Sequence, residues 1–207
     1  GDKIWNYSSN FIGGVASGAL WAILVSDNKV YVDQENVTRS DGKPYFGKVY
    51  CLDANTGDVA TPPTSLWNFT VNATISSPFA VHGDRLFFGT RRTAFGSTVV
   101  PTVYCLNKTD GTLFWSYTTE GSITYSGPAI SGDGKVLIGD ISNYLYCLNE
   151  VTGALIWKYK TGASIYGSPA IASASDGIVF LGSWDDTIYA IGPPPPKPPV
   201  ELNEFLV

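Results

Sequence analysis

The side chains that could carry out chemistry are few and widely spaced. His82 is the single histidine of the 207-residue chain. It falls in a predicted hairpin, and with no second imidazole we exclude a histidine-based metal cluster and a serine–histidine hydrolase centred elsewhere in the chain. Paired carboxylates stay open as an acid–base alternative, although Asp185 and Asp186 fall in a tight turn where backbone hydrogen bonds account for them. Asp133 lacks the further carboxylates of a calcium cage.

The three cysteines, Cys51, Cys105 and Cys147, occupy one equivalent position in a repeated segment. Equivalent positions in different repeats should lie too far apart for a disulfide, which needs Cα atoms within about 7 Å. We therefore interpret them as small buried apolar residues and not as ligands or nucleophiles. The residues thus predict no catalytic, cofactor-binding or metal-binding group.

The repeat is the strongest signal in the chain. VYCLDANTGDVATPPTSLW from Val49 returns as VYCLNKTDGTLFW from Val103 and LYCLNEVTGALIW from Leu145, with a truncated copy, IYAIG, from Ile188. Copies of a segment that recur at this spacing along a chain are typical of propellers and solenoids. Each of four units reads as a Trp strand, a small-residue strand, an apolar strand and a Tyr-Cys-Leu strand, separated by turn residues. We predict an all-β chain, a β-propeller of four four-stranded blades whose strands are buried on both faces.

One pattern within the repeat, small–x–Asp/Asn–x–x–x–Gly–x–x–x–Trp, resembles the tryptophan docking motif of pyrroloquinoline-quinone-type (PQQ-like) propeller repeats. The resemblance covers about residues 1–192. Here the small residue should let the next blade's Trp lie close, Asp or Asn should cap the turn, and Gly should supply its backbone conformation. The indole should pack flat between blades. The positions concerned are Trp5; Cys51, Asp53, Gly57 and, after six extra residues, Trp67; Cys105, Asn107, Gly111 and Trp115; Cys147, Asn149, Gly153 and Trp157.

The resemblance implies an architecture more than an activity. Quinone-dependent dehydrogenases of this family have eight blades, calcium held by acidic and amide ligands, and often a disulfide between adjacent cysteines. This sequence has four blades, no adjacent cysteines and no recognisable carboxylate set near the expected axis. We therefore expect no cofactor and no catalysis, as in the family's non-enzymatic surface proteins. The alternatives are a fragment of a PQQ-dependent dehydrogenase or other propeller enzyme, and a periplasmic scaffold for membrane-protein assembly.

The order of the segments leaves the ring size open. The chain begins with a Trp strand, residues 4–7, and ends its repeats with the strand at 188–191. These two could pair within one chain and close a four-bladed ring. Pairing between two copies would instead make each chain half of an eight-bladed dimer. A third possibility is a piece cut from a longer propeller.

Composition and sequons favour an exported protein. The net charge of −5 argues against a nucleic-acid partner, and no stretch approaches the ~18 apolar residues of a membrane span. Five N-x-S/T sequons are present, of which Asn107 also serves the turn motif. We predict N-linked glycans on some of Asn6, Asn36, Asn68 and Asn72, and an extracellular or cell-surface location.

Features outside the repeat are where we expect contacts. Two insertions, residues 34–48 and 91–102, should protrude from one propeller face and offer Tyr45, Phe46 and Phe95. Tyr125 and Tyr166, by contrast, are equivalent in their repeats and should be packing residues near the axis.

The C-terminal tail is the other non-repeating element. After the propeller, residues 1–192, comes a polyproline linker at 193–200. An extra strand at 201–207 follows, with Leu202, Phe205 and Val207 as apolar contacts, either beginning a further domain or donated to a partner subunit. The predicted function is a non-catalytic surface, adhesive or self-assembling module, a homo-oligomer or a binder of a protein partner, acting through the insertions and the tail.

Overall fold

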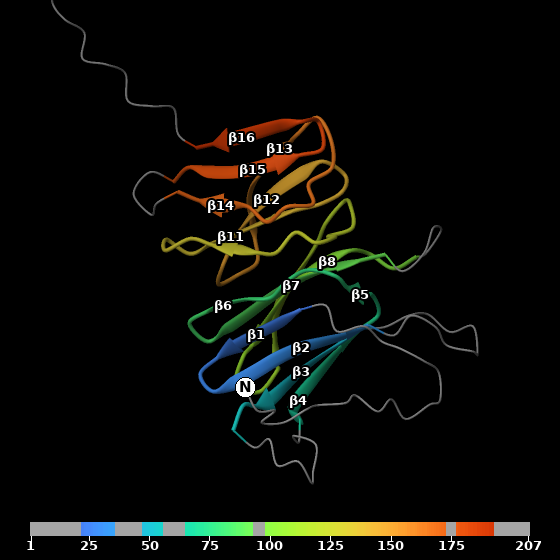
Figure 1. The fold of residues 1–207 in the computed structure, drawn as a ribbon, viewed down its shortest axis with the longest axis vertical. Helices are drawn as coiled ribbons and strands as arrows, with labels where there is room; N and C mark the ends of the chain where they lie inside the picture. Colours follow the sequence, from blue (N-terminus) through green and yellow to red (C-terminus); the bar gives the residue numbers. More distant parts are fainter. Residues whose placement is uncertain (1–21, 36–46, 56–64, 93–97, 173–176, 193–207) are drawn as a thin grey trace, which may run out of the picture.

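The computed structural model describes residues 22–35, 47–55, 65–92, 98–172 and 177–192, and every regular element among them is a β-strand. The all-β prediction is therefore confirmed. Four antiparallel sheets follow one another along the long axis of the molecule (Figure 1).

Each sheet contains the small-residue, apolar and Tyr-Cys-Leu strands of one repeat unit, and the first three sheets end with the Trp strand that opens the next unit. The first contains β1 (Ile23–Ser26), β2 (Lys29–Glu35), β3 (Gly47–Asp53) and β4 (Ser65–Val71). The second contains β5 (Thr74–Ile75), β6 (Ala80–His82), β7 (Arg85–Arg91), β8 (Thr102–Asn107) and β9 (Leu113–Thr118). The third contains β10 (Ala129–Ile130), β11 (Lys135–Gly139), β12 (Tyr144–Asn149) and β13 (Leu155–Lys160). The fourth contains β14 (Ala170–Ile171), β15 (Val179–Ser183) and β16 (Thr187–Ile191).

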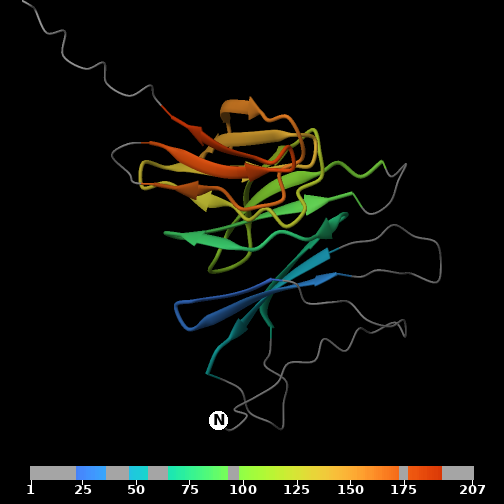
Figure 2. The same ribbon diagram turned by 45° about the horizontal axis from the view of Figure 1, so that its top comes forward.

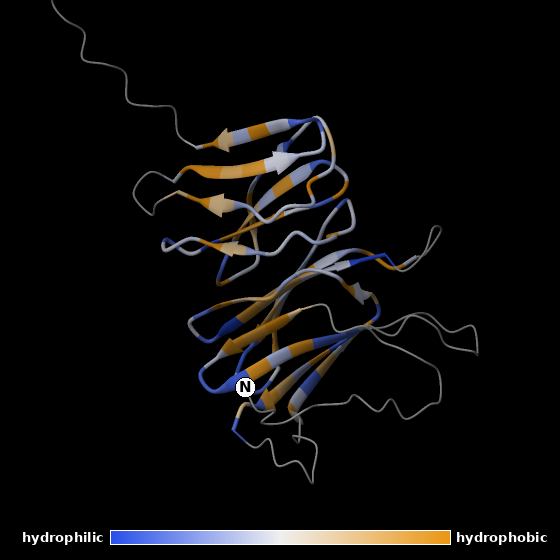
Figure 3. Cartoon of the chain, viewed as in Figure 1, coloured by the Kyte–Doolittle hydropathy of each residue, from blue (hydrophilic) through white to orange (hydrophobic). Residues whose placement is uncertain are grey.

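The hairpin turns use the residues expected of tight reversals. Asp27 and Asn28 between β1 and β2 have φ of 49° and 58°, and Gly83 in the equivalent turn before β7 has φ of 56°. Asparagine, aspartate and glycine are the residues that tolerate this left-handed region at least cost. The turns therefore form from local sequence, and hydrophilic residues gather there while apolar ones run along the strands (Figure 3).

The core lies between the sheets. One apolar cluster joins the first and second sheets, another the second and third, and another the third and fourth. In β7 every residue from Leu86 to Thr90 is buried, because both faces of a middle sheet meet protein. This explains the consecutive apolar residues of the repeat.

The tryptophans of β4 and β9 join successive sheets. The indole Nε1 of Trp67 donates to the carbonyl of Lys108 at 3.2 Å, and that of Trp115 donates to the carbonyl of Glu150 at 2.8 Å. Both acceptors lie in the turn that closes the following sheet's last hairpin. The Trp therefore packs on the turn of the blade after its own. Our expectation that each motif receives the next blade's Trp was wrong in direction: the preceding blade supplies it.

Glycine and asparagine shape that receiving turn. Gly111 and Gly153 have φ of 76° and 72°, and a Cβ on either would lie 2.5 Å from an atom of the Trp67 or Trp115 ring. The side-chain oxygen of Asn107 accepts a hydrogen bond from the Thr109 amide at 2.8 Å, which caps the turn. Glycine is thus needed both for the backbone conformation and for the close approach of the indole.

Sheets one and four lie at opposite ends of the array in two views (Figures 1 and 2). None of the apolar clusters formed by the described residues joins these two sheets. The strand at 4–7, which would complete the fourth sheet, lies outside the described residues, as do Trp5, Gly57 and the tail from 193 to 207.

Candidate binding face

The antiparallel order places two kinds of connection at one end of every sheet. These are the turns between the second and third strands and the segments that enter from the preceding sheet. Both predicted insertions leave the sheets at this end, after β2 and after β7. We call it the connection end of the molecule. Their predicted contact residues Tyr45, Phe46 and Phe95 lie outside the described residues, as do Leu202, Phe205 and Val207.

Three aromatic side chains form a row at the connection end. The rings of Tyr125 and Tyr166 have centroids 6.3 Å apart, and those of Tyr166 and Trp184 are 4.5 Å apart. Tyr125 is 54% exposed and Trp184 is 72% exposed. The expectation that Tyr125 is a packing residue was therefore wrong. We call Tyr125, Tyr166 and Trp184 the aromatic row.

The backbone under the row is held rigidly. The Tyr125 amide donates to the carbonyl of Ser76 at 2.8 Å, and the Trp184 amide donates to the carbonyl of Ser164 at 3.0 Å. Tyr125 has a φ of 64°, which costs a non-glycine residue free energy and persists only where its surroundings enforce it. The rings are thus presented to solvent from a fixed frame.

Sequence reasoning missed Trp184, although one signal was available. Trp184 stands in the turn between β15 and β16, where the third sheet has Ile141, and it has no place in the docking motif. A tryptophan that neither repeats nor docks a blade is a candidate for contact with another molecule.

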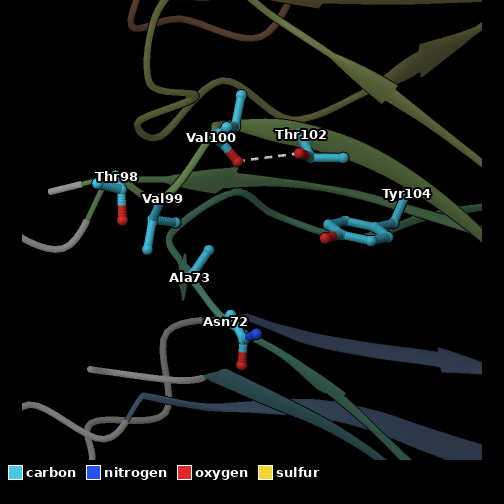
Figure 4. A pocket seen from close by; sticks show the side chains of 7 residues that line it. All are labelled: Asn72, Ala73, Thr98, Val99, Val100, Thr102 and Tyr104. Atoms are coloured by element: carbon cyan, nitrogen blue, oxygen red, sulfur yellow. Dashed lines mark hydrogen bonds between the residues drawn. The ribbon is translucent and has the colours of Figure 1, made fainter. Parts of the chain in front are cut away.

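A hollow of about 420 Å³ lies at the junction of the first and second sheets, between the segment after β4 and the segment before β8 (Figure 4). Its floor includes Tyr104, whose ring stacks on Phe88 at 5.2 Å, and burial raises the pKa of the Tyr104 hydroxyl. The residues lining the hollow are Asn72, Ala73, Thr98, Val99, Val100, Thr102 and Tyr104.

Two of the four asparagines predicted to carry glycans lie among the described residues. Asn68 in β4 and Asn72 at the rim of the hollow have exposed side chains, as an attached sugar requires. Asn6 and Asn36 lie outside the described residues. The exposure of Asn68 and Asn72 is compatible with glycosylation without testing it.

The carboxylates at the connection end serve the fold. The buried Asp140 accepts hydrogen bonds from the Tyr146 hydroxyl at 2.9 Å and from the Gly121 amide at 2.8 Å. Asp185 repeats the arrangement with Tyr189 at 2.6 Å and the Gly162 amide at 2.8 Å. The hydroxyl of Tyr189 lowers the pKa of Asp185 by hydrogen bonding to its charged form. Each aspartate holds the segment that enters its own sheet.

The remaining reactive groups are also held in structural contacts. His82 lies 2.7 Å from a carboxylate oxygen of the buried Glu150, a contact that links the second and third sheets at the end opposite the aromatic row. The three cysteines are buried and none is in a disulfide. Burial raises the pKa of the Cys51 and Cys147 thiols to about 11 and that of Cys105 to about 12. Such thiols stay protonated and unreactive at neutral pH.

The described residues offer neither a metal centre nor a membrane-spanning helix. They contain no group of three or more His, Cys, Asp and Glu side chains placed to hold a metal ion. Within the same ranges, no helix has the length and hydropathy of a membrane span.

Repeated sheets joined by docked indoles define the class of protein, a β-propeller built from PQQ-like repeats. The chain belongs to this family: the family model described as outer membrane protein assembly factor BamB matches residues 47–125 and 101–192. A search of curated proteins gives no significant match.

Solved structures that share the fold include the following three. BamB from Moraxella catarrhalis is 21% identical over 84% of this chain and 47% of that one, with a TM-score of 0.61. The computationally designed Ika4 protein is 15% identical over 93% of this chain and 98% of that one, with a TM-score of 0.63. The designed Ika8 protein is 17% identical over 84% of this chain and 46% of that one, with a TM-score of 0.59. The chain thus spans about half the length of BamB.

Proposed function

We propose that the chain is an exported, non-catalytic propeller that binds a protein partner at its connection end. The observation that carries the proposal is the aromatic row, in which Tyr125 and Trp184 stay exposed on a rigid frame. Exposed aromatic rings on an ordered scaffold are typical of protein interfaces, because Tyr and Trp bury much area at little cost in conformational entropy. The aspartates beneath the row are engaged in holding the sheets, which supports binding over catalysis.

The chemistry of the row indicates what it would bind. Trp184 and Tyr166 form an apolar surface with hydroxyl and indole N–H groups at its margin, and the hollow lined by Val99, Val100 and Tyr104 is open at the same end of the sheets. A protein segment with one or two apolar side chains suits both features. The insertions and the tail would add contacts around this centre.

The proposed location is the cell surface or the extracellular space, with glycans on some of Asn6, Asn36, Asn68 and Asn72. The exposed positions of Asn68 and Asn72 support this. Self-association through the ends of the propeller is part of the same proposal.

Site-specific photo-cross-linking tests the proposed binding face. A photoreactive amino acid replaces Trp184, and a second chain carries it at Val151, an exposed apolar residue in the turn between β12 and β13 at the opposite end of the sheets. After irradiation in cells of the source organism, we expect a discrete protein adduct from position 184 and none from position 151. Adducts from both positions, or from neither, would contradict the proposal.

A second candidate, a scaffold in outer-membrane protein assembly, is favoured by the family match to the BamB model. In this case the adduct at position 184 should be a component of an outer-membrane assembly machinery. Identification of the cross-linked protein by mass spectrometry separates the two candidates.

A further inference from the structure

We propose that the two end sheets of the propeller are binding faces for each other, and that the last sheet of one chain stacks on the first sheet of a second copy. This deepens the self-association part of the proposed function. The argument starts from a contact that recurs inside the chain.

Inside the chain, a glycine in the strand before the Tyr-Cys-Leu strand of a sheet receives an isoleucine from the segment that leaves that sheet. A Cβ on Gly89 would lie 2.4 Å from Ile123, and a Cβ on Gly139 would lie 2.3 Å from Ile165. The amide of Ile123 then donates to the Thr90 carbonyl at 3.0 Å. We call this contact the glycine socket.

The fourth sheet carries the same socket without its occupant. Each of the three glycines pairs with the residue at the same position of the following Tyr-Cys-Leu-type strand, so the glycines are equivalent. The pairs are Gly89 with Val103, Gly139 with Leu145, and Gly182 with Ile188. No described atom lies within 4 Å of a Cβ built on Gly182. The outer face of the fourth sheet is therefore built to receive a following blade.

Exposure supports this interpretation. Ile188 is 81% exposed, whereas its equivalents Val103 and Leu145 are fully buried. Phe180 is exposed too, although its equivalents Phe87 and Leu137 are buried. We call Phe180, Gly182, Ile188 and Ala190 the last face.

The first sheet carries the complementary face. Among the described residues, Val30, Val32 and Leu52 form a cluster within that sheet, with Tyr50 packed against it. Their register equivalents in the third sheet, Val136, Ile138 and Leu148, pack against the second sheet. The side of the first sheet that carries this cluster therefore corresponds to the side with which the third sheet packs against the second. Val30, Val32 and Leu52 are themselves buried, whereas Ile23 and Val25, which pair with Val32 and Val30 on the same side of the sheet, are 67% and 66% exposed. We call Ile23 and Val25 the first face.

A second copy fits these faces because they lie at opposite ends of the array (Figures 1 and 2). Two chains related by a two-fold axis place the last face of each on the first face of the other. Both junctions are then identical, all four end faces are covered, and the assembly closes. In Figure 3, β1 in the first sheet and β15 in the fourth sheet carry the apolar colour.

Light scattering during size-exclusion chromatography tests the proposal on the full unglycosylated chain. We expect twice the chain mass of 22.2 kDa. Ile188→Asp places a charge at both junctions and should raise the dissociation constant about a hundredfold or more, which gives the monomer mass at micromolar concentration. Val151→Asp, an equally non-conservative change at an exposed site outside both faces, should leave the dimer intact.

Mixing two defective chains controls for misfolding. Val25→Asp damages only the first face and Ile188→Asp only the last face, so a mixed pair retains one intact junction. The mixture should recover part of the dimer mass, which neither variant gives alone. A chain mass of 22.2 kDa for the unaltered protein up to 200 µM, as in a ring closed within one chain, would overturn the proposal. So would masses that grow with concentration beyond two copies.

The outcome is separable from that of the cross-linking test. Ile188 faces away from the third sheet, whereas the Trp184 ring lies on Tyr166 in the segment between the third and fourth sheets. A monomeric chain could still give the adduct at position 184, and a dimeric chain could fail to give it.

Discussion

At the scale of single residues, the indole rings determine where neighbouring sheets meet, and one glycine in each receiving turn makes that contact possible. Gly111 must adopt a positive φ and must also lie against the face of Trp67. Gly83 has a similar φ of 56°, but nothing lies within 4 Å of a Cβ built there. Substitutions at Gly83 and Gly111 can therefore separate two free-energy costs. One is the cost of placing a side chain at positive φ, and the other is the cost of disturbing the contact between Gly111 and the Trp67 ring.

We therefore expect Gly83→Ala to lower the free energy of unfolding by about 1 kcal/mol, the cost of a left-handed alanine. Gly111→Ala should lower it by about 3 kcal/mol, because the new methyl group also displaces the indole of Trp67. Urea unfolding followed by tryptophan fluorescence measures both. Equal losses for the two variants would show that the Trp docking contributes nothing.

The cysteines lead to a prediction about pH. Burial raises the pKa of the Cys105 thiol from 9.0 to about 12, with smaller rises for Cys51 and Cys147. Above pH 9 the unfolded chain loses thiol protons that the folded chain keeps, so the unfolded state gains stability. The thiol contribution is thus fully present below pH 9 and is lost as pH rises toward 12. The unfolding free energy should fall between pH 9 and 10, and less steeply in a variant with all three cysteines replaced by alanine. Equal slopes would contradict the assignment.

At the scale of strands and turns, the sequence predicted what the repeat contains and missed what depends on packing between repeats. Four sheets, their strand order and their turns follow from local periodicity. The direction of Trp docking does not, because both directions satisfy the same spacing around Cys105 and Trp115. The exposure of Tyr125 was also missed: equivalence to Tyr166 indicated packing, but the conformation that turns its ring outward is visible only in three dimensions.

The aspartate that holds each incoming segment gives an element-scale prediction. Asp140 accepts four hydrogen bonds in a buried site, from Tyr146 and from the amides of Gly121, Ser142 and Tyr144. Asp140→Ala leaves these donors without their acceptor and should lower the unfolding free energy by about 3 kcal/mol or more. Asp185→Ala removes the equivalent group where water can replace it, so the loss should be smaller. Thermal and urea unfolding compare the two. A larger loss at Asp185 would contradict the argument that burial makes the Asp140 hydrogen bonds the more costly to lose.

At the scale of the whole molecule, stability should follow from contacts between successive sheets, as in other repeat proteins, because the three inter-sheet clusters join only neighbours. In such an array a sheet with one uncovered face opens more readily than a sheet covered on both. The proposed dimer covers the first and last faces. The amides of the end sheets should therefore be about as well protected from hydrogen exchange as those of the middle sheets.

Amide hydrogen exchange gives the corresponding measurement. In the unaltered protein, amides of β15 and β16 should exchange nearly as slowly as those of β11 and β12 in the third sheet. In Ile188→Asp the fourth sheet loses its cover, and its exchange should become at least about tenfold faster, while the third sheet keeps its protection from both neighbours. The first sheet, whose cover is lost in the same event, should accelerate together with the fourth although Ile188 is at the other end of the chain. Acceleration confined to the fourth sheet would mean that the mutation acts locally and that the two end faces do not meet.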